Sequence, residues 1–211
     1  MIDIRIKHRI FGPQGLRPLE VEYQVKEGSV VHLTGKSGIG KTTFFHAVAG
    51  LLKPDDGFIQ KGNKVFLDTA NNLFLTPQER NLALMFQQYA LFPNMTLKQN
   101  VAFAQKTKSK AEVNALLEAF GLSGLENRYP SELSGGQQQR TALARALAQK
   151  ADILMLDEPF SAVDEAMHPM MTQEILKFRE ETGATVFIIS HYANGLENWV
   201  TDNLHLPDLS E

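Results

Sequence analysis

The stretch GKSGIGKT, residues 35–42, decides the expected fold, because it matches G-x-x-x-x-G-K-[S/T] between an apolar stretch and a helical one. Its glycines let successive N–H groups point at one anion, and the following helix N-terminus adds positive charge. Lys41 is expected to reach the β- and γ-phosphates of a nucleotide, and Thr42 to place its hydroxyl on Mg²⁺. The alternative is a glycine-rich turn that only starts a helix. The predicted phosphate site comprises Gly35, Lys36, Ser37, Gly38, Ile39, Gly40, Lys41, Thr42 and Thr43.

Two acids follow a buried apolar stretch in ILMLDEP, residues 153–159. Desolvated carboxylates at a strand end are costly unless they meet a cation or a proton donor, and ligands bind at that end of a parallel sheet. We expect Asp157 to hold Mg²⁺ and Glu158 to be the base for an attacking water. Pro159 keeps Glu158 out of the helical region and ends the strand. An ordinary exit from a strand into a turn is the alternative.

Two further strand ends carry polar residues of the same kind. VFIISHY ends in His191, which is expected to bond the γ-phosphate or orient the attacking water. MFQQY presents Gln87, whose amide can reach Mg²⁺ or water. A surface histidine and an ordinary polar loop entry are the alternatives.

Alternation of strands and helices predicts an α/β fold with a mainly parallel core sheet and an antiparallel N-terminal β-subdomain. Half-exposed strands are expected in IDIRIK and LEVEYQV, and buried ones in SVVHLTG, ALMF, DILMLDEP and ATVFIIS. One domain is expected over 1–211, with a nucleotide-binding core at 1–87 and 150–211 and an inserted helical subdomain at 88–149. The expected helices cover residues 41–52, 97–104, 110–120, 137–149 and 167–181.

Composition excludes several classes of protein. The 211-residue chain has a net charge of −3 with scattered basic residues, so nucleic acid is not expected as a partner. Without cysteine, it can form neither disulfides nor thiolate metal sites. The N-terminus lacks the pattern of a secretion signal, and the longest apolar runs fall below the roughly 20 residues that span a bilayer. We expect a soluble globular protein that something else must anchor if it works at a membrane.

The stretch LSGGQQQR, residues 133–140, has no acid, base or metal ligand. Ser134 and Gln137 fit a capping box that starts a helix. A cap alone does not explain two consecutive glycines, which cost roughly 1 kcal/mol each relative to alanine. Bare N–H groups, a hydroxyl and a helix N-terminus together predict a second anion site, of the kind that two chains facing head to tail would use.

These motifs, in this order and over nearly the whole chain, resemble the ATP-binding subunit of an ABC transporter. GKSGIGKT is similar to its Walker A loop, ILMLDE to Walker B and LSGGQ to the family signature. Gln87 falls in the Q-loop, Asp164 at the end of a D-loop-like SAVD, and His191 in the H-loop. The resemblance implies ATP hydrolysis with ATP and Mg²⁺ as ligands.

The resemblance also implies a homodimer in which ATP lies between Walker A of one subunit and the signature of the other. Asp164 would link the two sites across the interface. Phe11, in RIFGPQG, sits where the family places an aromatic ring on adenine, and packing within its strand is the alternative. The signature residues expected to reach the nucleotide in trans are Ser134, Gly135, Gly136 and Gln137.

The segment LTPQERNLALMFQQYALFPNMTLKQNVAF is similar to the importer branch that serves molybdate, sulfate, maltose or polyamines. This resemblance implies a solute-binding protein as a partner, peripheral attachment to the cytoplasmic face of the inner or plasma membrane, and molybdate or another oxyanion as solute. Regulation by an extra C-terminal β-domain is not expected, since the chain ends before it. Transmembrane permease subunits are expected to dock near Tyr89, Leu91, Phe92 and Pro93.

Other functions would use the same chemistry. An exporter, a cell-division complex or a soluble ABC ATPase without a transport role is the alternative to an importer. The last of these usually has a coiled-coil insertion or two cassettes in one chain, and neither is visible here. After His191, YANGLENWV departs from the usual D-x-x-E-A.

Overall fold

A parallel sheet forms the centre of the molecule in the computed structural model, which describes residues 1–12, 15–190 and 198–206. Alternate residues of its strands face opposite sides, so Leu154 and Leu156 pack in one apolar cluster and Met155 in the other. Burial on both faces explains why these strands read as continuous apolar runs. In spatial order the strands are β10 (Asp202–His205), β3 (Val30–Thr34), β9 (Thr185–Ile189), β8 (Ile153–Asp157) and β7 (Leu82–Met85).

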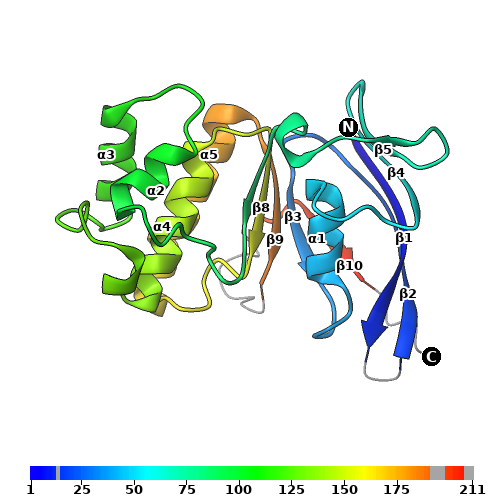
Figure 1. Cartoon of the computed structure of the whole chain (residues 1–211), viewed down its shortest axis with the longest axis horizontal. Coiled ribbons are helices and arrows are strands. Elements are labelled where there is room, and N and C mark those ends of the chain that lie inside the picture. Colours follow the sequence, from blue (N-terminus) through cyan, green and yellow to red (C-terminus); the bar gives the residue numbers. More distant parts are fainter. Residues whose placement is uncertain (13–14, 191–197, 207–211) are drawn as a thin grey trace.

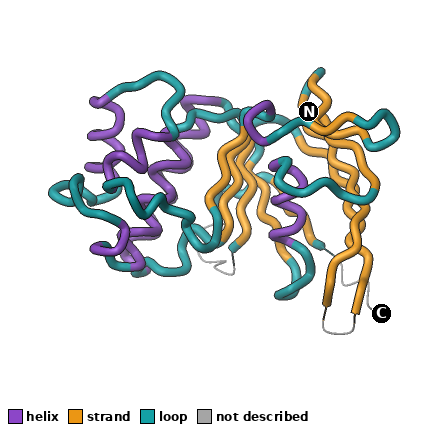
Figure 2. Tube along the Cα trace, viewed as in Figure 1, coloured by secondary structure: helices purple, strands orange, loops and turns teal. Residues whose placement is uncertain are grey.

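A second, antiparallel sheet lies to one side of the parallel sheet, on the right in Figures 1 and 2. Its inner face is buried at alternate positions such as Ile2, Ile4 and Ile6, while the residues between them are more exposed. The two long strands are those that the sequence predicts, and the three short ones were not predicted. In spatial order they are β2 (Gly15–Val25), β1 (Ile2–Gly12), β4 (Asp56–Lys61), β5 (Lys64–Asp68) and β6 (Leu73–Phe74).

Helices cover both faces of the parallel sheet. The first lies between the two sheets, and the other four lie on the far face (Figure 1). This arrangement confirms the predicted fold class. Within the described part of the chain, no helix has both the length and the apolar character needed to cross a bilayer. The helices are α1 (Lys41–Ala49), α2 (Leu97–Phe103), α3 (Lys110–Ala119), α4 (Gly135–Ala148) and α5 (His168–Thr182), and short 3₁₀ turns span Pro77–Glu79, Pro130–Glu132 and Glu165–Met167.

The helix ends differ from the predicted ones at two informative places. α1 stops at Ala49 and not at residue 52, because Gly50 takes a left-handed conformation with φ of 78° and closes the last turn. α4 begins at Gly135 and not at residue 137, so both glycines of the signature lie in its first turn. The Ser134 and Gln137 capping box is present as predicted.

Arg80 closes the end of α1 from within the core, where its side chain is only 1% exposed. Its Nη1 donates to the carbonyl oxygens of Ala47 and Val48 at 2.8 Å each, and its Nε donates to the Leu75 carbonyl at 2.9 Å. The guanidinium also lies over the ring of Phe74. Burial lowers the pKa of Arg80 to about 10. A cation at this position donates to carbonyls in the last turn of the helix and opposes their partial negative charge.

Gly50→Ala is expected to destabilise the protein more than Gly183→Ala, which serves as its control. Both glycines end a helix at positive φ, so each substitution costs about 1–2 kcal/mol in backbone conformation. Only at Gly50 would the new methyl meet other atoms, 2.6 Å from Arg80 Nε and 2.9 Å from the Leu75 carbonyl oxygen, which adds about 1–3 kcal/mol. Urea unfolding measures both losses. Equal losses of stability in the two variants would mean that Arg80 moves away from the new methyl group at no cost in free energy.

Candidate nucleotide-binding site

The predicted phosphate loop joins β3 to the N-terminus of α1. Gly35, Gly38 and Gly40 all have positive φ, which lets the loop curl over the helix end. Gly40 is the cap residue of α1, and no side chain caps the first turn, so its N–H groups can serve an anion. Lys41 Nζ donates to the carbonyl oxygens of Gly35 at 2.7 Å and Lys36 at 3.1 Å, which holds the ammonium over the loop.

Asp157 and Thr42 meet at the C-terminal end of β8. The Thr42 hydroxyl donates to Asp157 Oδ2 at 3.1 Å, across 115 residues of sequence. Asp157 is only 4% exposed, and this burial raises the pKa of its carboxyl, while the bond from Thr42 and the charges of His46 and Lys41 act in the opposite direction. The pair therefore offers a hydroxyl and a buried carboxylate side by side.

Glu158 follows in a conformation that few non-glycine residues adopt. Its φ is 52°, and its N–H donates to the carbonyl of Ile189 in the neighbouring strand at 2.9 Å. Its side chain is partly exposed and borders the same hollow as Thr42. β8 ends before Pro159, as predicted, and the left-handed turn directs Glu158 off the line of the strand.

One hollow of about 240 Å³ joins these groups. It unites the phosphate loop with Thr42, the adjacent acids Asp157 and Glu158, and Gln87, which come from three separate parts of the chain. Lys36, Gly35 and Ile39 belong to the loop but do not line this hollow, and Ile39 is buried beneath it. The lining residues are Ser37, Gly38, Gly40, Lys41, Thr42, Thr43, Gln87, Asp157, Glu158 and Ile189.

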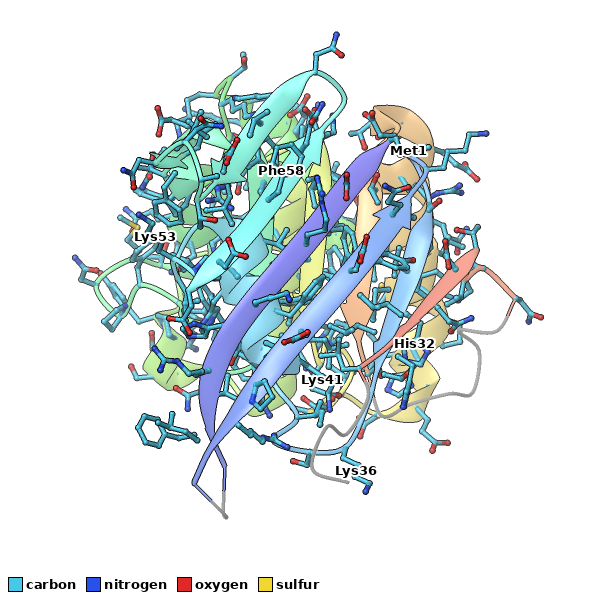
Figure 3. All side chains as sticks on the ribbon, turned by 90° about the vertical axis from the view of Figure 1, so that its right-hand side faces the viewer. Met1, His32, Lys36, Lys41, Lys53 and Phe58 are labelled. Carbon is cyan, nitrogen blue, oxygen red and sulfur yellow. The ribbon has the colours of Figure 1, made fainter. Side chains whose placement is uncertain are left out.

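The end of the β1–β2 hairpin lies beside the phosphate loop. Arg17 of β2 donates from Nη2 to the carbonyl of Gly38, a contact that the sequence did not predict. In Figure 3, Lys36 and Lys41 appear near this end of the hairpin. The ring of Phe11 is 85% exposed, so it does not pack within its strand. Its place close to the loop is compatible with the predicted adenine contact.

The predicted signature residues stand apart from this hollow. Ser134 Oγ accepts from the N–H of Gln137 at 3.3 Å, and Gln137 Oε1 accepts from the N–H of Ser134 at 2.9 Å. Ser134 and Gly135 are exposed, and so is Asp164 at the start of the 3₁₀ turn Glu165–Met167. None of the four predicted signature residues lines this hollow as it is described. His191 lies outside the described residues.

The predicted permease-docking segment is braced by two residues that the sequence analysis missed. Arg145 of α4 donates to the carbonyls of Tyr89 and Ala90 at 2.7 Å each, and its guanidinium lies over the Phe92 ring. Asn100, fully buried in α2, accepts from the Phe92 N–H at 2.9 Å and donates back to its carbonyl at 3.2 Å. Of the predicted docking residues, Tyr89, Leu91 and Phe92 are partly buried and Pro93 is exposed.

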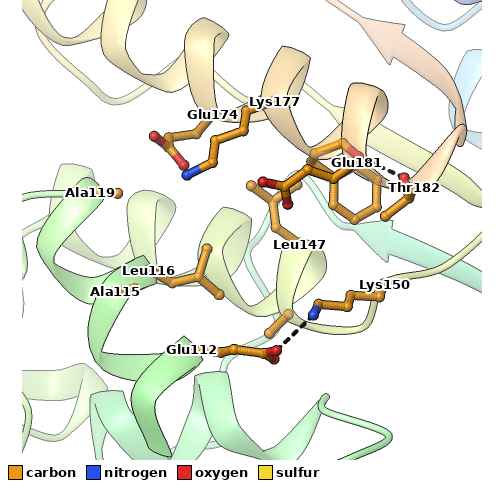
Figure 4. Close-up of a pocket in the computed structure, with 12 residues that line it drawn as sticks. Glu112, Ala115, Leu116, Ala119, Leu147, Lys150, Glu174, Lys177, Glu181 and Thr182 are labelled. Carbon is orange, nitrogen blue, oxygen red and sulfur yellow. Dashed lines mark hydrogen bonds and ion pairs between the residues drawn. The ribbon is translucent and has the colours of Figure 1, made fainter. Parts of the chain in front are cut away.

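A second hollow separates α3 and α4 from α5 (Figure 4). Its lining is mainly apolar, with Leu116 and Leu147 among its residues, and an ion pair between Lys150 and Glu112 at 2.8 Å crosses its edge. It contains neither the phosphate loop nor the acids of the first hollow. It is therefore not part of the candidate nucleotide site.

A phosphate loop whose threonine bonds the aspartate ending a neighbouring parallel strand defines a nucleotide-binding protein of the P-loop NTPase class. The sequence profile described as "ABC transporter" matches residues 19–161. The chain belongs to the ABC transporter family.

Curated relatives include three import ATP-binding proteins. The trehalose/maltose protein MalK of Thermococcus litoralis is 39% identical over 82% of this chain, and the sulfate/thiosulfate protein CysA of Thermosynechococcus vestitus is 40% identical over 82%. The Fe(3+) ions import ATP-binding protein FbpC 2 of Rhizobium meliloti is 39% identical over 85% of this chain. The matches cover 48%, 51% and 48% of these proteins, so this chain spans about half their length.

Solved structures of ATP-binding cassettes share the whole fold. The dimeric post-hydrolysis structure of the cassette MJ0796, bound to ADP and Pi, superposes with a TM-score of 0.83 at 29% identity, covering 98% of this chain and 94% of that one. A second dimeric structure of MJ0796, described as a bacterial ABC transporter cassette, gives a TM-score of 0.81 at 30% identity over the same fractions.

Asp157→Asn is expected to stabilise the nucleotide-free and Mg²⁺-free protein at pH 8. An aspartate in an unfolded chain loses its proton near about pH 4, whereas the buried carboxyl keeps its proton to higher pH. Stability is therefore lost as the pH rises from about 4 through the raised pKa, and a neutral asparagine removes this loss. Its amide oxygen can still accept from Thr42.

Urea midpoints of the parent and of Asp157→Asn at pH 8 and pH 4 measure this effect. The variant should have the higher midpoint at pH 8, and the difference should be smaller at pH 4. A lower midpoint of the variant at both values would contradict the attribution to burial of the carboxylate.

Proposed function

We propose that this chain hydrolyses ATP and powers the transport of a solute across a membrane. The observation that carries the proposal is the single hollow that joins the phosphate loop, the Thr42 and Asp157 pair and Glu158. The family membership and the likeness to a cassette bound to ADP and Pi support ATP as the nucleotide.

The loop amides and Lys41 hold the phosphates in this proposal. Thr42, Asp157 and Gln87 supply a hydroxyl, a carboxylate and an amide oxygen, which are hard donors that suit Mg²⁺. Among the described residues, no group of three or more His, Cys, Asp or Glu side chains is placed to hold a metal ion, which fits an ion bound mainly through nucleotide phosphates and water. When bound, Mg²⁺ neutralises charge on the β- and γ-phosphates.

Glu158 accepts the proton of the attacking water, and Lys41 stabilises the charge that develops on the γ-phosphate. Gln87 orients water at the entrance of the subdomain 88–149. His191 is assigned to the γ-phosphate on the sequence motif alone. The left-handed conformation of Glu158 supports its assignment as the base, because strained backbone conformations are concentrated at active sites, where the surrounding structure enforces them.

Two copies of the chain assemble head to tail in the active form. The signature residues Ser134, Gly135, Gly136 and Gln137 then reach the γ-phosphate in the other copy, and Asp164 lies at the interface. Phe11 stacks on adenine. The exposure of Ser134 and Phe11 and the dimeric state of the similar cassettes support this assembly.

Permease subunits dock on the braced segment around Tyr89, Leu91, Phe92 and Pro93. Attachment is peripheral, at the cytoplasmic face of the inner or plasma membrane, and a solute-binding protein delivers the solute. The three relatives described above are import proteins, which supports import over export. An oxyanion such as molybdate is the proposed solute class, which the similarity to the sulfate/thiosulfate protein supports.

Glu158→Gln is expected to lower kcat for ATP hydrolysis at least about a hundredfold, because the amide cannot accept the proton of water. ATP affinity should be retained, and ATP should trap a dimer. Phosphate release and size-exclusion chromatography with ATP and Mg²⁺ measure these outcomes. Glu180→Gln, at an exposed position of α5, is the control and should keep the parental rate. Unimpaired hydrolysis by Glu158→Gln would remove Glu158 as the base.

Ser134→Phe is expected to leave ATP binding by the monomer nearly unchanged and to block ATP-driven dimerisation and hydrolysis, because the ring would occupy the place of the partner's γ-phosphate. Ser109→Phe is the matched control, since Ser109 caps α3 through the N–H of Glu112 in the same way. Nucleotide titration, light scattering and phosphate release separate the effects. Full activity of Ser134→Phe would reduce the signature to a helix cap.

A further inference from the structure

Gln139 is a buried amide that joins α4 to the segment after β8. Its side chain has no exposed surface. Nε2 donates to the carbonyl oxygen of Glu158 at 2.8 Å and to Ser161 Oγ at 3.1 Å, and Oε1 accepts from the N–H of Ala162 at 2.8 Å. One side chain therefore contacts three residues of a segment that lies about 20 positions further along the chain.

The surroundings fix which way the amide faces. The N–H of Ala162 can only donate and the carbonyl of Glu158 can only accept, so a flipped amide would lose both bonds. Both N–H groups and the oxygen of Gln139 are satisfied in this orientation. Gln139 thus fixes both the position and the orientation of the segment after β8 through directional hydrogen bonds, which an apolar residue of similar size could not form.

The restrained peptide is the one that follows the candidate base. Glu158 has a φ of 52°, which costs of order 1–3 kcal/mol for a non-glycine residue and persists only where neighbours hold it. Its N–H donates to the carbonyl of Ile189 in β9. Its carbonyl accepts from Gln139 of α4 at 2.8 Å, and more weakly from the hydroxyl and the N–H of Ser161 at 3.2 Å and 3.4 Å. The bond from Gln139 is the shortest of these and the only one of them that comes from α4, and together they fix the backbone from which the Glu158 carboxylate extends.

The same contact reaches the first turn of α4. A Cβ on Gly136 would lie 2.9 Å from the carbonyl oxygen of Ala162, so the helix start and this segment touch without an intervening side chain. Gln139 is on the next turn of that helix. The signature and the peptide after Glu158 are therefore held together as one unit within a protomer.

We infer that Gln139 is a positioning residue that holds Glu158 in its hydrolytic geometry and couples it to the signature at the start of α4. The inference rests on the proposed ATPase function. In the head-to-tail dimer, the signature of one protomer contacts the nucleotide of the other. Gln139 then transmits the position of the signature in one site to the base of the second site.

Steady-state ATP hydrolysis by the full chain tests this role with Gln139→Met and Gln139→Glu. Met keeps the length without donors, and Glu keeps the acceptor for Ala162 but places oxygen against the Glu158 carbonyl. Both should lower kcat about tenfold or more, since small displacements of a catalytic group have effects of this size, with KM for ATP within about twofold of the parent. Gln149→Met is the control, because Gln149 bonds the Leu82 carbonyl from the other end of α4.

A double-mutant cycle distinguishes positioning of the base from general damage. In a Glu158→Gln background, Gln139→Met should change the residual rate less than about twofold, because the base it positions is already absent. Ser161→Ala, at an exposed position, removes a hydroxyl that contacts both Gln139 and the Glu158 carbonyl, and it should give a smaller loss of kcat that is not additive with Gln139→Met.

Three results would overturn the inference: kcat within about twofold of the parent in both Gln139 variants, an equal loss in Gln149→Met, or a full additional loss in the Glu158→Gln background. If Gln139→Met and Gln139→Glu fail to fold, an unchanged kcat in Ser161→Ala counts against it. A parent chain without ATP hydrolysis, or unimpaired hydrolysis by Glu158→Gln, would instead contradict the proposed function.

Discussion

Burial of α1 between the two sheets is the constraint on which the candidate site depends. Phe44 and Phe45 have no exposed surface, and the helix is packed against the antiparallel sheet on one side and the parallel sheet on the other. Such a helix cannot shift without opening an apolar cluster that contains both sheets. Arg80 bonds carbonyls at its C-terminal end, and its N-terminal end holds the phosphate loop beside Asp157.

On the other face of the parallel sheet, α4 is fixed by polar side chains as well as by apolar packing. Gln139 bonds the peptide after Glu158, and Arg145 bonds the carbonyls of the predicted docking segment. Hydrogen bonds are directional, so they fix the rotation and the axial position of a helix that apolar contacts alone would leave adjustable. One rigid helix thus links the signature, the candidate base and the docking segment.

The sequence predicted β3, β7, β8 and β9 of the parallel sheet and the five helices, because apolar periodicity and capping signals are strong in those segments. It missed β4, β5 and β6, although residues 56–68 contain two short apolar runs around a Lys-Gly-Asn turn that is typical of a hairpin. It also missed Arg80, because an arginine among polar neighbours resembles a surface residue until the fold buries it. For Gln139, the sequence predicts only a place in a helix.

By itself, the sequence determined the local chemistry: the curl of the phosphate loop, the capping box of Ser134 and Gln137, and the order of the motifs. These features depend on residues a few positions apart, where backbone geometry alone brings the groups together. The tertiary structure decided that Thr42 meets Asp157 across 115 residues, that burial raises the pKa of that carboxyl, and that Gln139 holds the peptide after Glu158. Such contacts depend on strand order and helix packing, which no short stretch of sequence specifies.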